Sequence, residues 1–155
     1  MIVCLPATVA DLPRLTALEN AAFVTDRIRC RQFRYLLSKT LIVKAVDGEP
    51  DSEVLVGCLV LLFRRDSHHA RIYSLAVSPV ARRRGVARRL LAYAETESRR
   101  RGLIGIVLEV RPDNEAAIAL YQAAGFRQIG HRLNYYEDGA AAVRLSKIFA
   151  DESAR

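Results

Sequence analysis

Apolar positions change their spacing several times along the chain, and each change predicts a different element. Strands are predicted where short apolar or alternating runs occur, at Ile2–Leu5, Leu41–Val46, Val54–Phe63, Ala70–Val77, Leu103–Val110, Arg127–Tyr135 and Ala142–Ile148. Helices are predicted where apolar residues recur at helical spacing, from Thr8 to about Phe23, over Arg29–Lys39, over Gly85–Arg101 and from Asn114 to Ala124. After the first strand, the order is two helices, an antiparallel meander, and then alternating helices and strands. No repeat or linker interrupts it, so we expect one α/β domain over residues 1–155.

Capping residues support the predicted helix ends. Thr8 and Asp11 form a T-x-x-D start signal for the first helix. Asn114 stands where the last helix needs an N-cap, and Gly125 stands where that helix should stop. Gly102 ends the helix before it in the same way.

The start of the third helix carries an unusual charge. Residues 74–95 read SLAVSPVARRRGVARRLLAYAE, which places three arginines and a glycine where a strand passes into a helix. Positive side chains oppose the helix dipole at this end, so an anion is expected there. Backbone N–H groups at a helix start, reached through a glycine, are suited to bind phosphate.

Composition narrows the function classes. The chain has 155 residues with 51% hydrophobic and 26% charged residues, which is typical of a globular protein with its own core. The three cysteines form no metal or disulfide pattern, so no metal is expected. No signal peptide and no membrane-spanning run is found, so we expect a cytoplasmic protein without a membrane partner.

The net charge of +7 has two interpretations. Much of it lies in Arg82–Arg84 with Arg88–Arg89, and in Arg99–Arg101, which flank one predicted helix. Either these arginines form a solvated helix face or the first run binds a small polyanion. No nucleic-acid motif or aromatic interleaving accompanies them, so a nucleic-acid partner is not expected.

Two motifs resemble a known family. Neither G-x-x-x-x-G-K-[ST] nor G-x-G-x-x-G is present, but Arg82-x-x-Gly85-x-Ala87 resembles the acyl-CoA pyrophosphate loop (Q/R-x-x-G-x-G/A) of the GNAT N-acetyltransferase superfamily. The segment LEVRPDNEAAIALYQAAGF, residues 108–126, resembles the next strand and helix of that family. Within the superfamily, LEVR, AIALY, GF and the NYY at 134–136 are most similar to ribosomal-protein alanine N-acetyltransferases.

The resemblance implies a fold and a co-substrate. The fold would be a single GNAT-like α/β (α+β) domain with a mixed, mostly antiparallel central sheet flanked by about four helices. Acetyl-CoA would be the co-substrate, with its pantetheine arm paired to the strand at Leu75, Ala76 and Val77. Its pyrophosphate would be held by the loop residues Arg83, Arg84, Gly85, Val86, Ala87 and Arg88. Asn114 would contact the cofactor, cap the helix, or do both.

The resemblance also implies an acid and a base. Tyr121 would give a proton to the departing thiolate; as an isolated helical tyrosine it would be a core residue. Glu109 lies in a strand that looks buried, where a carboxylate is costly unless it is paired or functional, and it would be the general base. Exposure at the strand end is the alternative for Glu109. Nothing near Cys30 or Cys58 argues for an activated thiol, so direct transfer is expected.

The acceptor is the least constrained feature. Asn134, Tyr135 and Tyr136 match the segment near the peptide entrance in the resembled branch, or else the tyrosines pack across strands. The Pro-Trp element of that branch is missing, and the chain has no tryptophan. Three functions therefore remain open: acetylation of a protein N-terminus or lysine, acetylation of a small amine, and a non-catalytic CoA sensor. A protein N-terminus is the expected acceptor, because at neutral pH its α-amine is more often neutral than the amine of a lysine.

Overall fold

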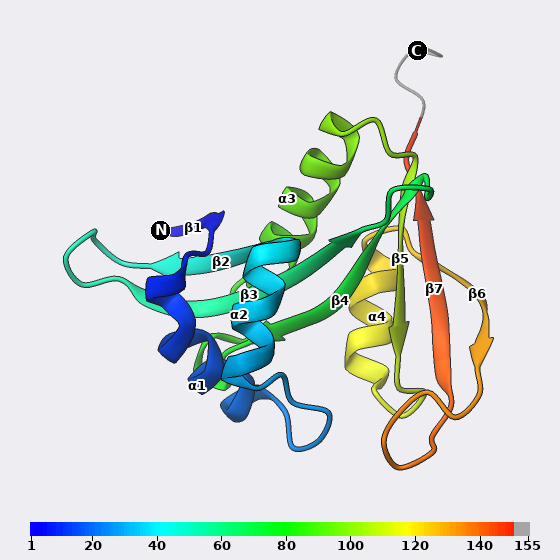
Figure 1. The fold of residues 1–155 in the computed structure, drawn as a ribbon, viewed down its shortest axis with the longest axis horizontal. Coiled ribbons are helices and arrows are strands. Elements are labelled where there is room, and N and C mark those ends of the chain that lie inside the picture. Colours follow the sequence, from blue (N-terminus) through cyan, green and yellow to red (C-terminus); the bar gives the residue numbers. More distant parts are fainter. Residues whose placement is uncertain (151–155) are drawn as a thin grey trace. The chain divides into compact units, whose positions relative to one another are not determined.

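A computed structural model describes residues 1–150 as two compact units. The first contains Met1–Leu62 and Tyr73–Tyr93, and the second contains Phe63–Ile72 and residues 94–150. The elements of the chain, labelled in Figure 1, are β1 (Ile2–Pro6), α1 (Leu12–Ala22), α2 (Cys30–Lys39), β2 (Leu41–Asp47), β3 (Val54–Phe63), β4 (His69–Val77), α3 (Val86–Arg100), β5 (Gly105–Val110), α4 (Glu115–Ala123), β6 (Arg127–Arg132) and β7 (Ala142–Ile148). Strand β4 and helix α3 each contribute residues to both units.

The sheet is mixed and mostly antiparallel, as expected. Its strand order is β1-β2-β3-β4-β5-β7-β6. In the first unit, β1 pairs antiparallel with β2, and β2 pairs antiparallel with β3. In the second unit, His69–Ile72 of β4 run parallel to β5, while β5 pairs antiparallel with β7 and β7 with β6. The seven strands and four α-helices of residues 1–150 match the predicted architecture.

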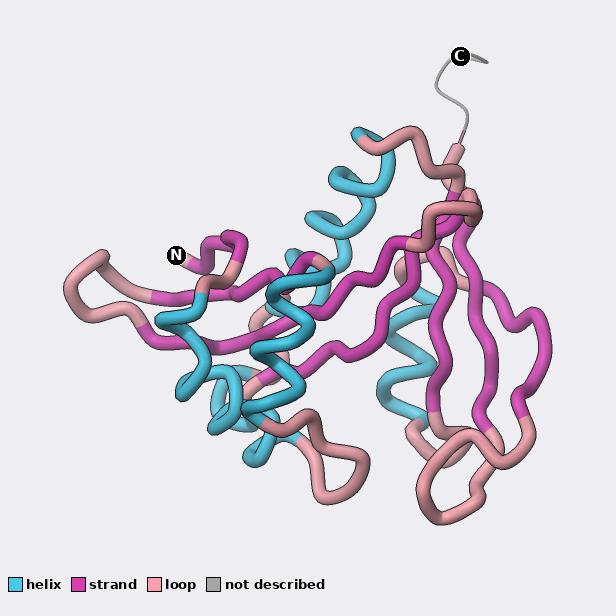
Figure 2. The backbone as a smooth tube through the Cα atoms, viewed as in Figure 1, coloured by secondary structure: helices cyan, strands magenta, loops and turns pink. Residues whose placement is uncertain are grey.

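The core of the first unit lies between the sheet and helices on its two faces. Leu15 of α1 and Phe33 of α2 belong to one buried cluster with Ile42 of β2 and with residues of β3. Figure 2 shows helices α1 and α2 beside these strands. Gly57 of β3 faces the other way, where an added Cβ would lie 2.6 Å from Val86 of α3. The glycine therefore allows α3 to pack closely on β3.

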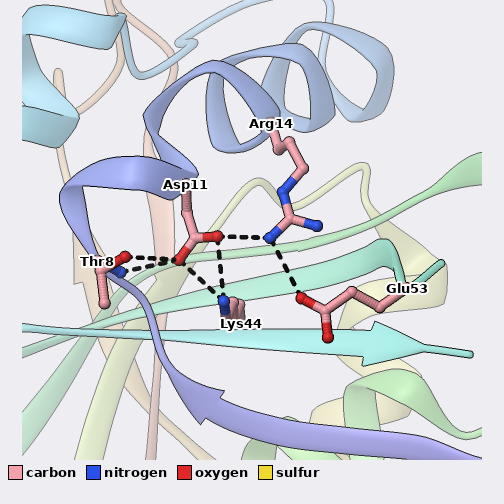
Figure 3. A network of polar contacts seen from close by, with 5 residues as sticks. All are labelled: Thr8, Asp11, Arg14, Lys44 and Glu53. Carbon is pink, nitrogen blue, oxygen red and sulfur yellow. Dashed lines mark hydrogen bonds and ion pairs between the residues drawn. The ribbon is translucent and has the colours of Figure 1, made fainter. Parts of the chain in front are cut away.

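A buried carboxylate fixes the start of α1 (Figure 3). Asp11 is 2% exposed and accepts from the Thr8 backbone N–H at 2.9 Å, from Arg14 at 2.5 Å and from Lys44 at 3.1 Å. Burial alone would raise the pKa of Asp11, but these three donors bring it to about 2. Arg14 also reaches Glu53 at 3.5 Å. The network ties the helix start to β2 in the position that the T-x-x-D signal indicated.

The first predicted helix begins differently from expectation. Val9–Asp11 form a 3-10 turn, and the α-helix starts only at Leu12. Pro13 explains the break, because proline has no N–H to donate to the carbonyl of Val9. The helix is therefore two short helical segments joined at Asp11.

The strand predicted over Arg127–Tyr135 is three residues too long. β6 ends at Arg132, and the next segment is a loop in which Asn134 has φ +51. A positive φ leaves the strand region of backbone space, which asparagine tolerates better than most residues. Tyr135 and Tyr136 therefore lie in the β6–β7 loop, and the prediction that extends the strand to Tyr135 is wrong.

Candidate active site

The segment between β4 and α3, in the first unit, contains two residues with positive φ. Arg83 has φ +65 and Gly85 has φ +77, and α3 begins at Val86. The first helical hydrogen bond is donated by the Arg89 N–H to the Gly85 carbonyl at 3.1 Å. The N–H groups of Val86, Ala87 and Arg88 therefore have no partner within the helix. A Cβ added at Gly85 would meet no atom within 4 Å, so the loop faces open space there.

The arginines around this loop fall into two groups. Arg84 is held by Asp47 at 2.6 Å, and Arg89 donates to the Ile2 carbonyl at 3.0 Å. Among residues 1–150, the side chains of Arg83 and Arg88 make no hydrogen bond or ion pair. The guanidinium groups of Arg83 and Arg88, like that of Arg82, therefore remain available to an anion, while Arg84 would have to leave Asp47 first.

The carboxyl half of β4 keeps backbone groups available. The parallel ladder with β5 runs from His69↔Gly105 to Ile72↔Leu108. Leu75, Ala76 and Val77 come after the end of this ladder, so the ladder does not use their N–H and carbonyl groups on that side. On the other side of β4, the N–H of Ser78, the residue after the strand, donates to the Val56 carbonyl of β3 at 2.8 Å.

Glu109 lies in β5 of the second unit, surrounded by guanidinium groups. Its side chain is 2% exposed, so the alternative of an exposed strand end is wrong. Oε2 accepts from Arg71 Nε at 3.1 Å. Oε1 lies 3.3 Å from Arg132 Nε and 3.6 Å from Arg144 Nε, yet it accepts no hydrogen bond. One oxygen of the carboxylate therefore accepts a hydrogen bond and the other accepts none.

Arg71 connects Glu109 to the β6–β7 loop. While its Nε bonds to Glu109, its Nη2 donates to the Tyr135 hydroxyl. The rings of Tyr135 and Tyr136 meet edge to face at 4.9 Å, and Arg111 lies 4.2 Å from the Tyr136 ring centroid. Sequence reasoning selected Glu109 and both tyrosines, and the second unit links them through Arg71.

Helix α4 carries the other two predicted residues of this unit. Asn114 accepts from the Ala117 N–H at 3.2 Å, so it is the N-cap of α4 as predicted. Tyr121 is 7% exposed and packs edge to face on Phe126 at 5.6 Å. Burial, followed by the nearby Tyr136, raises the pKa of the Tyr121 phenol above its usual value near 10. Tyr121 therefore packs against Phe126 and also lies near Tyr136 of the β6–β7 loop.

The thiol of Cys58 is placed unfavourably for catalysis. Cys58 is buried in the core of the first unit, and burial raises the pKa of its thiol, which disfavours the thiolate. No group of three or more His, Cys, Asp or Glu residues suited to a metal occurs in residues 1–150. Within the same range no helix has the length and apolar character needed to cross a membrane.

Sequence reasoning missed the arginines of the Glu109 site. Arg144 is the direct cross-strand neighbour of Glu109, and Arg71 lies opposite Val107 on the same face. Both relations depend on strand order and register, which no local pattern in the sequence specifies. The only sequence signal for these arginines is the position of Glu109 itself. A carboxylate within an apolar strand is costly to bury unless it has a partner.

The chain is similar to acetyltransferases in sequence and in structure. Residues 12–126 match the model of the acetyltransferase (GNAT) family. A ribosomal protein bS18-alanine N-acetyltransferase of Salmonella typhimurium is 45% identical over 67 residues, which cover 43% of this chain and 45% of that protein. The aligned part thus spans about half the length of this curated relative.

Two solved structures share the fold over nearly the whole chain. The ribosomal-protein-S18-alanine N-acetyltransferase of Escherichia coli has a TM-score of 0.83 and 26% identity, covering 98% of this chain and 97% of that chain. A chain of the NatC complex bound to Gag peptide and CoA has a TM-score of 0.79 and 25% identity, covering 96% of this chain and 99% of that chain. With the family model matching most of its length, this chain belongs to the GNAT family of acetyltransferases.

Proposed function

We propose that this chain transfers the acetyl group of acetyl-CoA to a primary amine, and that the acceptor is the α-amine of a protein N-terminus. The observation that carries the proposal is the start of α3. Unused N–H groups, two residues with positive φ and open space beside Gly85 meet there. These features fit a diphosphate, because the helix dipole and the N–H groups favour negative charge while no side chain fills the space.

Residues of the first unit would hold acetyl-CoA, which supplies an activated thioester. Backbone groups of Leu75, Ala76 and Val77 would pair with the peptide-like pantetheine arm. Arg83 and Arg88 would give charge-assisted hydrogen bonds to the pyrophosphate alongside the N–H groups of Val86 and Ala87. Arg84 would exchange Asp47 for a phosphate, and Asn114 would add a contact while it caps α4.

Glu109 would act as the general base. A base needs a lone pair that is not already used, and Oε1 accepts no hydrogen bond in this structure. Arg71 fixes the other oxygen, so the carboxylate keeps one orientation while Oε1 takes the proton of the ammonium directly or through water.

Tyr121 would act as the general acid. The departing sulfur needs a proton, and a donor must still hold its proton at neutral pH. The raised pKa of Tyr121 keeps the phenol protonated throughout the physiological range. The rigid ring contact with Phe126 fixes the direction in which the hydroxyl is presented.

Two arguments favour an N-terminal amine as the acceptor. An α-amine titrates near pH 7.7–8.0 and a lysine near 10.4, so at neutral pH the α-amine is the more available nucleophile. One carboxylate is then sufficient to remove its proton. Asn134, Tyr135 and Tyr136 would lie along the peptide, as the resembled branch implies. The similar Salmonella protein is named as a ribosomal protein bS18-alanine N-acetyltransferase.

The test is acetylation of short peptides that carry a free N-terminus and one internal lysine. Fragmentation mass spectrometry should locate the acetyl group on the α-amine. Peptides with a blocked N-terminus and a panel of small amines, offered in parallel, are the controls. Label found only on the lysine, or only on small amines, would refute the acceptor. Absence of transfer to every amine would refute the enzymatic activity.

A further inference from the structure

Two arginines beside Glu109 have unused hydrogen-bond donors. Arg132 and Arg144 each approach Oε1 of Glu109 through Nε, at 3.3 and 3.6 Å. Within the described part of the chain neither side chain makes a hydrogen bond, and the Nε of Arg144 is buried without a partner. The terminal NH2 groups of both guanidinium ions are therefore available. Their side chains are 43% and 32% exposed, so solutes can reach them.

The charge around Glu109 is unbalanced. Three guanidinium groups, those of Arg71, Arg132 and Arg144, lie within 4 Å of one carboxylate. Arg71 donates to Glu109 and to Tyr135, whereas Arg132 and Arg144 both lie against the other oxygen of Glu109 without a hydrogen bond. Holding several partly buried cations around one anion is unfavourable unless another anion joins them.

The fold leaves room for such an anion. Gly130 of β6 is the register partner of Arg144, which is in turn the partner of Glu109, so the three positions share one face of the sheet. A Cβ added at Gly130 would meet no atom within 4 Å. Open space therefore lies beside Gly130, on the face of the sheet that carries Arg144 and Glu109.

We infer that Arg132 and Arg144 bind a carboxylate of the acceptor. The preferred acceptor is then an amine with an acidic group close to it. The foremost example is a protein N-terminus with Asp or Glu among its first residues. The inference rests on the proposed function and specifies its substrate class. Guanidinium groups match carboxylates through paired N–H donors, which fixes geometry as well as adding affinity. The same carboxylate would neutralise excess charge beside Glu109 and hold the amine near Oε1.

The test uses peptides that differ only in charge. Peptides of equal length carry Asp or Asn at position 2, and Glu or Gln at position 3, with a neutral sequence elsewhere. Binding is measured by calorimetry in the presence of CoA, and initial rates are measured with acetyl-CoA. A charged hydrogen-bonded pair predicts about tenfold or more in favour of each acidic peptide, in the dissociation constant and in kcat/KM.

Variants of the full chain assign the preference to these residues. Arg132→Gln and Arg144→Gln should each reduce the acid-over-amide ratio to a few-fold or less. Gly130→Leu should weaken binding of acidic and neutral peptides by filling the open space. Arg65→Gln is the matched control, because it removes the same charge from the turn before β4, where Arg65 has no described partner, and it should leave the ratio unchanged. Circular dichroism verifies that each variant is folded.

The outcomes separate this inference from the proposed function. Equal binding of acidic and amide peptides to the wild-type chain would overturn the inference even if acetylation proceeds. A preference that persists in folded Arg132→Gln and Arg144→Gln would also overturn it. Charge-dependent binding without acetylation would refute only the proposed function. Free aspartate or glutamate acetylated as efficiently as the peptides would support acid recognition and identify a small acidic amine as the acceptor.

Discussion

Glu109 and Glu19 are both buried carboxylates, and their surroundings assign them different roles. Glu109 is held by cations, as described above, and has one oxygen that accepts no hydrogen bond, which suits its proposed role as the base. Glu19 of α1 is 2% exposed and accepts only the backbone N–H of Ile28 at 3.0 Å among the described residues. Burial therefore raises the pKa of Glu19 from 4.5 to about 7, with small opposing effects from Ile28 and Arg27.

Replacing Glu19 should change how stability depends on pH. Between pH 4.5 and about 7 the folded chain binds more protons at Glu19 than the unfolded chain, so the free energy of unfolding falls as pH rises through this window. Glu19→Gln keeps an acceptor for Ile28 without a charge. We expect the variant to be more stable than the wild type by up to about 3 kcal/mol at pH 8, with the difference vanishing near pH 4.

Urea unfolding at several pH values measures this effect. Glu49→Gln, which removes the same charge from an exposed turn, shows whether net charge alone alters stability. Parallel stability curves for Glu19→Gln and the wild type across pH 4–8 would contradict the role given to burial.

Tyr121 can be tested without disturbing its packing. Tyr121→Phe keeps the ring contact with Phe126 and removes only the hydroxyl. Loss of a general acid should lower turnover by about 10²–10⁴-fold and leave the affinity for acetyl-CoA nearly unchanged. Rapid-quench measurement of the chemical step and calorimetric titration of acetyl-CoA provide the two readouts, with Tyr93→Phe on α3 as the control. Wild-type chemistry in Tyr121→Phe would make Tyr121 a packing residue only.

At the scale of elements, the loop before α3 depends on one glycine. Gly85 has φ +77, a region that side chains beyond glycine rarely adopt, and its Cα faces open space. Gly85→Val should strain the loop and place methyl groups where the pyrophosphate is proposed to lie. We expect at least a tenfold loss in acetyl-CoA affinity, about 1.4 kcal/mol. Calorimetry on Gly85→Val checks this, and Gly102→Ala at the end of the same helix, also at positive φ, is the control for strain alone. Unchanged affinity in Gly85→Val would refute the loop assignment.

The elements that the sequence predicted well are those with local signals. Asn114 and Gly125 enclose α4, and Gly102 follows α3 with φ +78, as their residue types indicated. The β6 boundary was missed because Leu133 continues an apolar pattern, whereas Asn134 turns the backbone out of the strand. Apolar spacing reports which residues can form a strand but not where backbone conformation ends it.

The candidate site was only partly predictable for a related reason. Glu109 and Tyr121 lie in motifs that resemble the family, so their positions were selected directly from the sequence. The partners of Glu109 come from three other strands, and they meet it only through the registers of β4, β7 and β6. A pairing over 38 positions, such as Arg71 with Glu109, has no local signature.

At the scale of the whole molecule, the excess positive charge is unevenly compensated. In the second arginine run of the sequence, Arg100 and Arg101 both pair with Glu97, at 2.6 and 3.0 Å. Arg83 and Arg88 near the Gly85 loop, and Arg132 and Arg144 near Glu109, have no such compensation by hydrogen bonds. The uncompensated charge thus lies where anionic ligands are proposed.

This distribution predicts a salt dependence that differs between acceptors. The Debye length falls from about 30 Å at 10 mM salt to about 8 Å at 150 mM, which screens attraction between a chain of net charge +7 and an anionic peptide. With acetyl-CoA kept saturating, kcat/KM for the acidic peptides should fall several-fold over this range, mainly through KM. The isosteric amide peptides should change little, because they lack the side-chain carboxylate that the positive field of the protein attracts. Initial rates at five or more salt concentrations measure both slopes, and equal slopes for acidic and amide peptides would show that the protein's positive charge does not select the acceptor.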